Sequence, residues 1–477
     1  MKKFTMPKTK EKIGLILFSL MSLMGLGGCD DSYVELDVPP VYGSNPNSKV
    51  VFTGFTPTEG SVRTTMFIHG DNFGTDPSLI DVKIGGQTAK VIRANNTEIY
   101  CIVPARADKG YVEVTIWDAN KTSSVSHRFN ERFTYIYNTT VGTLCGVVDD
   151  EGNAAFKDGT FEEAGFTQPG LIYTDPKDDD ILYVFEQSAS QLRRINIEKE
   201  TVETLIATAS GWNQVNSIAW SITGDTMFVN NNQSNDDGPA MFILKREEDF
   251  KQPHLMMTGK DCNCVFTNPV DGSIFCIIGT NAKLHRPTFN EATQMYDLGD
   301  PVASVATNGQ WFQSIQFVPT GDYLMGTSRQ SHYVFKATYD WTEKRPTNPL
   351  AFVGNGGAGY GEGVGTTGAF FNSPRQGVFV YNEEYAAEGR DPQDCYDYYV
   401  AGSTNHCIHK VTPTGTVSTY AGRGSVSTTG NVAGYIDGAL RTEAQFNWPE
   451  GITYIESRKT FYISDAGNHR IRTIAIQ

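Results

Sequence analysis

Residues 447–476 read NWPEGITYIESRKTFYISDAGNHRIRTIAI, and they decide the fold. Two short apolar runs, ITYI (452–455) and FYISD (461–465), are joined by the charged turn ESRK (456–459). A second turn, GNH (467–469), leads into the third run, RIRTIAI (470–476). Short apolar runs bounded by turn residues predict β-strands. The stretch is therefore expected to form three successive antiparallel strands.

The same pattern recurs upstream, with repeat starts spaced by 47, 46, 51, 63 and 74 residues. Each start is followed by a second strand, a polar turn and a third strand, and a fourth strand is visible in VETLIA (202–207), LAFVG (350–354) and VSTYAG (417–422). Four-stranded repeats of this length predict a β-propeller, here with six blades. The first strands start at Leu171, Ile218, Cys264, Ile315, Val378 and Ile452.

Only three strands follow Pro449 in the last repeat, so one strand of the ring is missing from its expected place. We expect GTLCGVV (142–148) to supply it, because the sequence after it, 150–170, parallels the sequence 422–451 that follows VSTYAG. The first strand of the module would then complete the last blade. Such closure leaves no exposed sheet edge at the chain end.

The last two repeats, 399–422 and 447–474, resemble NHL repeats, whose pattern is Pro-x-Gly before an apolar strand and Asp-x-x-Asn-x-Arg-Ile after the next one. The resemblance is direct for 350–477. For 140–350 it rests on the periodicity, with Ser217, Ser314 and Gly377 at the position of Gly451. We therefore assign residues 138–477 to an NHL-like propeller.

Residues 49–137 form a separate module with period-two strands between Gly and Pro turns, which is typical of β-sandwiches. The ordered motifs PTEG (57–60), GDNFG (70–74), GG (85–86) and VP (103–104) resemble the IPT/TIG immunoglobulin-like family. In secreted bacterial proteins this resemblance implies a spacer or an adhesion module. The whole chain is thus expected to be all-β, a sandwich followed by a propeller.

The N-terminus predicts the cellular address. Five lysines precede an apolar run from Ile13 to Leu26, and Leu-Gly-Gly then precedes Cys29. A basic start, a short apolar core and small residues describe a signal peptide over 1–28. The stretch resembles a bacterial lipobox, which implies a lipid on Cys29; ordinary secretion with a free cysteine is the alternative. Residues 29–48 read as a tether, and Asp30 and Asp31 resemble the export signals of Bacteroidota surface lipoproteins.

The charge and the cysteine content limit the kinds of partner and cross-link that the protein can have. Lys plus Arg total 39 and Asp plus Glu total 54, a net charge of −15, which argues against a nucleic-acid partner. Of the 8 cysteines, Cys29 aside, none lies in a C-x-x-C or zinc-type spacing. Cys264 and Cys276 could lie on adjacent strands and be joined, or all of them could be buried free thiols.

The candidate ligand site lies on one face of the propeller, which we call the linker face because the linkers between blades and the turns between second and third strands open there. Surface loops on a rigid scaffold often carry function. Several tryptophans and amide side chains are expected at the blade entrances on this face. Tryptophan rings stack on sugars, and amides bond to hydroxyls, so such residues suit a glycan or a peptide. The alternative is that the tryptophans pack between blades. The predicted ligand-binding residues are Trp212, Asn216, Trp311, Gln313, Arg375, Gln376, Trp448 and Glu450.

Four histidines near the turns between second and third strands are weaker candidates for a divalent metal, namely His285, His332, His406 and His469. Some NHL-like propellers are metal-dependent lyases, so the resemblance leaves an enzyme open, although Asn-His-Arg-Ile is ordinary in non-catalytic repeats. The loop NNNQSNDDGPA (230–240) could hold Ca²⁺ or remain a solvated loop. No nucleophile motif, phosphate loop or H-E-x-x-H motif occurs, so no catalytic residue and no cofactor is predicted.

The leading hypothesis is a non-catalytic lipoprotein of the outer membrane, facing the cell surface, that captures an extracellular glycan. It would touch the membrane only through its lipid and would serve an outer-membrane transporter complex. A metal-assisted lyase and a protein-binding adhesin are the alternatives.

Overall fold

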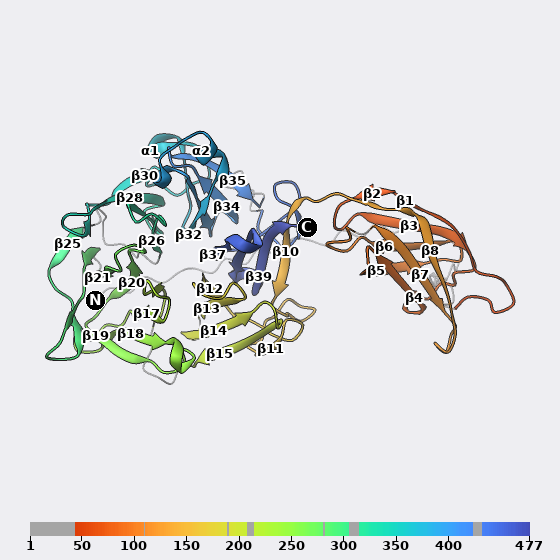
Figure 1. Ribbon diagram of the computed structural model, residues 1–477, viewed down its shortest axis with the longest axis horizontal. Helices are drawn as coiled ribbons and strands as arrows, with labels where there is room; N and C mark the ends of the chain where they lie inside the picture. Colours follow the sequence, from red (N-terminus) through yellow and green to blue (C-terminus); the bar gives the residue numbers. More distant parts are fainter. Residues whose placement is uncertain are drawn as a thin grey trace, which may run out of the picture.

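The computed structural model describes residues 43–477 except 109, 188–189, 208–213, 280–281, 305–313 and 423–431. The protein is all-β, and an immunoglobulin-like sandwich lies beside a six-bladed propeller (Figure 1). Among the described residues, no helix combines the length and the apolar character that crossing a lipid bilayer would require.

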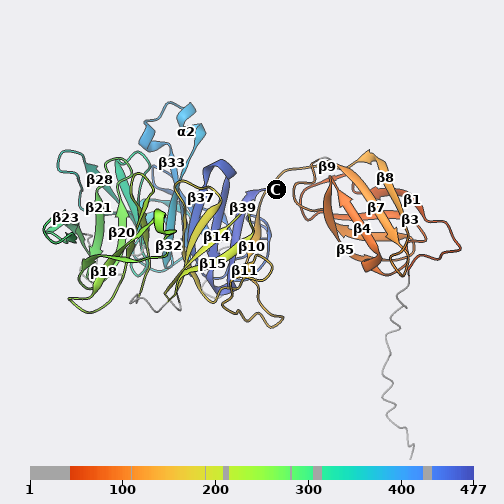
Figure 2. The same cartoon turned by 60° about the horizontal axis from the view of Figure 1, so that its bottom comes forward.

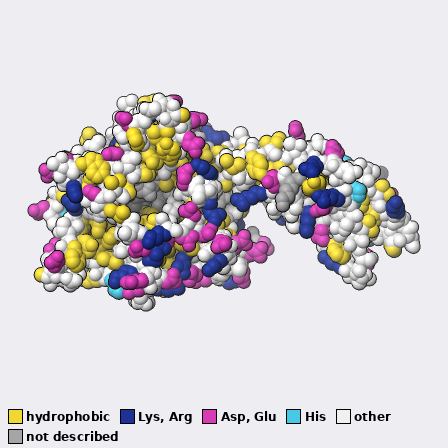
Figure 3. Space-filling view, viewed as in Figure 1, with side chains coloured by type: hydrophobic (Ala, Val, Ile, Leu, Met, Phe, Trp, Pro, Cys, Tyr) yellow, Lys and Arg dark blue, Asp and Glu magenta, His cyan; other side chains and the backbone are white. Residues whose placement is uncertain are grey.

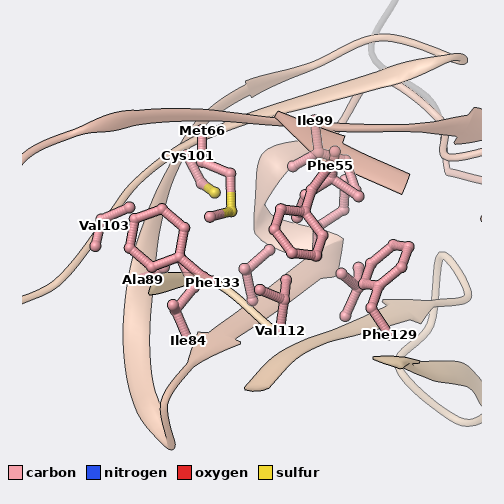
Figure 4. Packing of buried hydrophobic residues seen from close by; sticks show 14 of the residues in the cluster. Phe55, Met66, Ile84, Ala89, Ile99, Cys101, Val103, Val112, Phe129 and Phe133 are labelled. Carbon is pink, nitrogen blue, oxygen red and sulfur yellow. The ribbon is translucent and has the colours of Figure 1, made fainter. Parts of the chain in front are cut away.

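The sandwich is built from strands whose buried and exposed residues alternate, as in Ile80–Ile84, where every second residue is buried. The inward side chains form one core, in which Phe55, Met66 and Phe133 pack together (Figure 4). A short parallel pair, β2 (Glu59–Gly60) and β9 (Thr134–Tyr135), ties the ends of the module together. The hydrogen-bonded strands are, in sheet order, β1 (Val51–Thr56), β3 (Thr65–Asp71), β6 (Glu98–Ile102), β5 (Gln87–Ala94), β4 (Ile80–Ile84), β7 (Tyr111–Trp117) and β8 (Ser124–Arg132).

Each propeller blade is an antiparallel sheet that begins with its innermost strand. Blade 1 contains β12 (Pro169–Thr174), β13 (Ile181–Glu186), β14 (Gln191–Asn196) and β15 (Thr201–Ile206). Blade 2 contains β16 (Ile218–Trp220), β17 (Thr226–Asn230), β18 (Pro239–Lys245) and β19 (His254–Thr258). Blade 3 contains β20 (Cys262–Thr267), β21 (Ile274–Ile278), β22 (Lys283–His285) and β25 (Pro301–Ser304), with the hairpin β23 (Thr288–Asn290) and β24 (Met295–Asp297) inserted.

The remaining blades complete the ring. Blade 4 contains β26 (Ile315–Phe317), β27 (Tyr323–Ser328), β28 (Tyr333–Asp340) and β30 (Leu350–Val353), with β29 (Arg345–Pro346) beside β28. Blade 5 contains β32 (Pro374–Tyr381), β33 (Tyr396–Gly402), β34 (Cys407–Val411) and β35 (Thr416–Ala421). Blade 6 contains β37 (Pro449–Ile455), β38 (Thr460–Asp465), β39 (Arg470–Ile476) and β10 (Thr139–Cys145).

Blade 6 closes the ring as expected, because the first strand of the module pairs with the last. β10 lies antiparallel to β39, with Thr139 opposite Ile476 and Gly142 opposite Thr473. The strand begins three residues before the predicted stretch 142–148 and ends at Cys145. Gly146 ends it with φ of 114°, and a Cβ there would lie 2.6 Å from the carbonyl oxygen of His469.

Three consecutive blades carry a short fifth strand from the linker that precedes them. β31 (Gly363–Val364) pairs with the outer strand of blade 5, β36 (Gly438–Ala439) with that of blade 6, and β11 (Gly159–Thr160) with that of blade 1. These linkers thus cover the outer edges of their blades, where an unpaired strand would otherwise be exposed.

Two buried arginines fix the linkers of blades 1 and 6. Arg193 on β14 donates to the carbonyl oxygen of Gly165 at 2.7 Å and to the carboxylate of Asp158 at 2.9 Å. Arg472 on β39 bonds in the same way to Asp437, with Nη2 and Oδ1 2.6 Å apart. Neither arginine is exposed at all, so these contacts are part of the core.

The two faces of the disc differ in their connections. The face opposite the linker face carries the turns between first and second strands, and we call it the turn face. It faces the viewer in Figure 1, and α2 (Glu383–Ala387), in the first such turn of blade 5, projects from it in Figure 2. α1 (Gly365–Gly368) belongs to the linker before blade 5.

All seven described cysteines are buried free thiols, which was one of the two outcomes left open by the sequence. Cys264 and Cys276 lie on adjacent strands as expected, but they are not opposite each other: Cys264 pairs with Ile277, and Cys276 with Val265. A disulfide between them is therefore absent.

Candidate functional site

Five of the eight predicted ligand-binding residues fall within the described part of the chain. They lie at the entrances of blades 2, 5 and 6, on the linker face, and are Asn216, Arg375, Gln376, Trp448 and Glu450. The other three, Trp212, Trp311 and Gln313, lie outside the described residues, as does the predicted lipidation residue Cys29.

Gln376 is fully buried and connects three blades. Its Nε2 donates to the carbonyl oxygen of Ile172 at 2.8 Å, and its Oε1 accepts from the backbone N–H groups of Ile172 at 2.9 Å and Ile452 at 3.1 Å. The side chain therefore reaches from β32 to the inner strands of blades 1 and 6. Its amide is occupied by backbone groups, so the structure gives it a role in holding the ring together.

The close approach of these strands depends on glycine at one position. A Cβ on Gly451 would lie 2.5 Å from the carbonyl oxygen of Gly170 and 2.9 Å from the backbone nitrogen of Ile172. No side chain fits at that distance from a backbone atom. The Pro-x-Gly pattern at the start of β37 thus has a packing reason.

Arg375 and Glu450 form an ion pair near the axis, through Nε and Oε2, and are only 4% and 5% exposed. The carboxylate also accepts from Ser403 Oγ at 3.0 Å and from Gln187 Nε2 at 3.4 Å. Both oxygens of Glu450 are thereby bonded to donors from blades 5 and 1. A carboxylate held in this way fixes the positions of its neighbours on three sides.

Arg329, in the turn between β27 and β28, is exposed and adds a second positive charge beside this pair. Partial desolvation by the surrounding protein and the Arg375 guanidinium lower the pKa of Arg329, while the Glu450 carboxylate raises it, so the three charges interact. Two guanidinium groups thus face one carboxylate. These three groups together carry one net positive charge, on a chain whose net charge is −15.

Among the five described members of the predicted set, Trp448 is the exposed one, with 54% of its surface accessible. Its backbone is left-handed, with φ of 51°, which bulky residues rarely adopt. The backbone N–H of Trp448 donates to Nδ1 of His406 at 3.2 Å, which fixes this conformation. A rigid backbone therefore presents the indole ring to solvent, as a sugar-stacking platform would require.

The histidines near the turns between second and third strands hold backbone groups. His332 Nδ1 accepts from the N–H of Ser373 at 3.1 Å, just as His406 does from Trp448, so each histidine fastens the entrance of the next blade. His469 Nδ1 lies 2.6 Å from the carbonyl oxygen of Thr167, and His285 Nδ1 lies 3.0 Å from that of Gly299.

Burial lowers the pKa of His285, His332 and His406, which keeps these rings neutral near pH 7. The part of the chain that the structure describes contains no group of three His, Cys, Asp or Glu side chains placed to hold a metal. The four candidate metal ligands are thus spread over separate blades.

Asn216 and the predicted Ca²⁺ loop belong to the entrance and the second turn of blade 2. The backbone N–H of Asn216 donates to Oδ1 of Asn230 at 3.1 Å, and Asn230 Nδ2 donates to the carbonyl oxygen of Cys262 at 2.7 Å. Asn231 Nδ2 in turn donates to the carbonyl oxygen of Pro239 at 2.7 Å. The amides at the start of this loop therefore bond to backbone groups of blades 2 and 3.

Three residues around the pair of Arg375 and Glu450 were not predicted from the sequence, namely Gln187, Arg329 and Ser403. Each follows a second strand directly. Their common position in the repeat was the available signal, but the residue type changes from blade to blade.

Comparisons with known proteins agree with this architecture. Residues 51–135 match the IPT/TIG domain family. An auxiliary nutrient binding protein from Bacteroides thetaiotaomicron VPI-5482 is 36% identical, with a TM-score of 0.67 over 91% of this chain and 99% of that one. A protein of the same description from Bacteroides ovatus ATCC 8483 is 29% identical, with a TM-score of 0.67 over 91% of this chain and 100% of that one.

A third structure, of a Bacteroides thetaiotaomicron VPI-5482 protein named as a candidate phosphatase, is 30% identical, with a TM-score of 0.67 over 91% of this chain and 99% of that one. No curated protein sequence matches. The identity of 36% extends over nearly the whole of both chains, so this protein belongs to the family of the auxiliary nutrient binding protein of Bacteroides thetaiotaomicron.

Proposed function

We propose that this protein is a non-catalytic lipoprotein that captures an extracellular glycan on the linker face of its propeller, as an accessory to an outer-membrane uptake system. The observation that carries the proposal is the likeness to an auxiliary nutrient binding protein over 99% of that chain. A shared architecture of both domains supports a shared role in binding, although folds alone do not determine function.

The chemistry of the linker face supports a glycan. Trp448 offers a flat ring to solvent from a fixed backbone, and such rings stack on the C–H faces of sugars. Arg329 supplies an exposed cation beside the buried pair of Arg375 and Glu450. A polysaccharide that contains uronic acids would satisfy both groups, because guanidinium pairs well with carboxylate.

We propose that the protein is attached to the membrane through its N-terminus. A signal peptide over 1–28, a lipid on Cys29 and a tether over 29–48 would place the sandwich between the membrane and the propeller. The sandwich would then act as a spacer that holds the NHL-like propeller away from the outer membrane, at the cell surface. Its strands span Val51 to Tyr135, and a short connection leads into β10 at Thr139.

Affinity electrophoresis of the full chain against neutral and uronate-containing polysaccharides tests this function. A cognate glycan should retard the wild-type protein, and Trp448→Ala should abolish the retardation. Trp341→Ala is the matched control, because Trp341 is 42% exposed but lies in the turn between the third and fourth strands of blade 4, on the turn face. Absence of retardation on every polysaccharide, or equal loss in both variants, would refute glycan capture by the linker face.

A protein-binding adhesin would behave differently. It would ignore polysaccharides and bind a surface protein. Capture of a transporter subunit by the wild-type chain, together with glycan retardation, would instead support the accessory role.

A further inference from the structure

The turn face holds a cavity of about 480 Å³ around the propeller axis. The ends of the inner strands of all six blades line it, and Figure 3 looks onto this face, with hydrophobic side chains around the hollow in the middle of the propeller. We call it the axial basin. It lies at the opposite ends of the inner strands from Arg375 and Glu450, so it is separate from the linker-face site. Its volume lies within the range of small-molecule sites.

The walls of the axial basin come from one position of the repeat. That position is the third residue after the repeat position of Gly451, for example Tyr173 after Gly170 and Tyr454 after Gly451. Blade 3 has Asn263 at the glycine position. Five of the six blades place an aromatic residue there. Blade 5 has Val380 at that position and lines the basin with Val378 instead. The aromatic residues are Tyr173, Trp220, Phe266, Phe317 and Tyr454.

These rings also pack between blades, which limits how much of each faces the basin. Phe266 and Phe317 are 3% and 7% exposed and therefore contribute only ring edges. Trp220 and Tyr454 are partly exposed and offer more of their surfaces. Two accessible rings at the wall of a cavity are what stacking on a sugar ring requires.

None of the described residues that line the axial basin is charged, although the chain carries 39 basic and 54 acidic residues. A charged ligand would lose hydration there without gaining a counter-charge, which disfavours its binding. The basin therefore favours an uncharged ligand. This preference is opposite to that of the linker face, where Arg329 adds a positive charge.

Uncharged hydrogen-bonding groups complete the lining. The side chains of Thr174, Gln316 and Thr453 face the cavity and make no hydrogen bond with other described residues. In contrast, the hydroxyl of Thr267 donates to the carbonyl oxygen of Trp220 at 2.9 Å and is already satisfied. One amide and two hydroxyls, from blades 4, 1 and 6, thus line the cavity, and the residue from blade 6, Thr453, is only 5% exposed.

We infer that the axial basin binds an uncharged mono- or disaccharide at a site independent of the linker face. Apolar walls would contact the C–H faces of the sugar, while Gln316, Thr174 and Thr453 would bond to its hydroxyls. The linker face would hold a polymer, and the basin would hold a short neutral sugar or the neutral end of a chain.

Saturation-transfer NMR and titration calorimetry on the full chain test the inference, with neutral mono- and disaccharides as probes and glucuronic acid as the charged counterpart. A neutral sugar should bind, and glucuronic acid should not. Gln316→Ala should weaken binding about threefold to tenfold, the effect of one lost hydrogen bond. Gln87→Ala, on an exposed strand position of the sandwich, is the matched control and should change nothing.

Trp448→Ala separates the two sites, because it should leave binding of the small sugar unchanged. Loss of that binding in Trp448→Ala would place the sugar on the linker face and overturn the inference. Binding of no saccharide in the panel, equal binding of glucuronic acid, or an unchanged affinity in Gln316→Ala would overturn it as well. A negative result with polysaccharides alone would count only against the linker-face function.

Discussion

Replacement of Arg472 by methionine should destabilise the propeller in a strongly pH-dependent way. Arg472 is fully buried, and its Nη1 lies 2.7 Å from Oδ2 of Asp465, which is also fully buried. Nη1 also donates to the carbonyl oxygen of Gln445. Nε and Nη2 donate to Asp437, and Nη2 also donates to the carbonyl oxygen of Ile436. The substitution therefore leaves one buried carboxylate without its counter-ion and releases the linker that precedes blade 6.

The size of the effect follows from the burial of Asp465. Burial raises the pKa of Asp465 to about 6 even with Arg472 beside it, against 3.8 for an ordinary aspartate. Folding therefore takes up a proton between about pH 4 and 6, and this carboxylate costs stability as the pH rises through that window, by about 3 kcal/mol at full ionisation. Breaking a buried pair by removal of one partner costs about 3–5 kcal/mol. We expect a loss of that size for Arg472→Met at pH 8.

At pH 5 the loss should be clearly smaller. Arg472 lowers the pKa of Asp465, so its removal raises that pKa further and leaves the carboxyl protonated and neutral at this pH. The remaining cost comes from the lost hydrogen bonds. Differential scanning calorimetry of the full chain at pH 5 and pH 8 measures both values, because sandwich and propeller can unfold in separate transitions.

Two further variants sharpen the test. Arg472→Met combined with Asp465→Asn should recover part of the stability at pH 8, because the unpaired charge is then gone. Arg458→Ala removes an arginine of the same blade that pairs with Asp180 at the surface, where 35% of its side chain is exposed, and should cost no more than about 1 kcal/mol. An equal loss at both pH values in Arg472→Met would refute the electrostatic reasoning and point to packing alone.

Two other predictions concern the axis and blade 5. Gln376→Leu leaves the backbone groups of Ile172 and Ile452 unpaired in the core. In urea titration this variant should lower the free energy of unfolding by about 3 kcal/mol or more. The control Gln87→Leu, at an exposed position, should change it by less than about 0.5 kcal/mol. Burial lowers the pKa of His409 to about 4, below the 6.5 of an ordinary histidine. The unfolded chain therefore binds this proton at a higher pH than the folded chain does. The stability of the fold should fall as the pH drops from about 6.5 towards 4. His409→Gln should flatten the decline of the melting temperature between pH 7.5 and 4.5, and parallel curves for the two proteins would contradict this assignment.

The repeat pattern of the chain was sufficient to predict the architecture. Short strands at regular spacing indicated six blades, and the three-strand ending required a partner strand from the start of the module. The pairing of β10 with β39 confirms that partner, although the strand begins at Thr139 and not at 142. The strand also ends at Cys145 and not at 148, because Gly146 has a positive φ that ends a strand without any change in hydrophobic pattern.

The roles of the side chains near the propeller axis were harder to predict from the sequence. The sequence places Arg375, Gln376 and Glu450 at blade entrances, but it does not say whether they face solvent or a neighbouring blade. That depends on the distance between inner strands, which Gly451 sets by its contact with Gly170. The same uncertainty applied to His332 and His406, whose partners lie on the next blade, about 40 residues away along the chain.

The sequence by itself determined the blades, the closure and the sandwich, because periodicity and turn residues act locally along the chain. Only the tertiary structure decided which polar groups are bonded to backbone, which aromatic ring remains exposed, and that the inner strands enclose an uncharged basin on the turn face. These features arise where six separate repeats meet at one axis. Their geometry depends on contacts between blades, and no single repeat encodes such contacts.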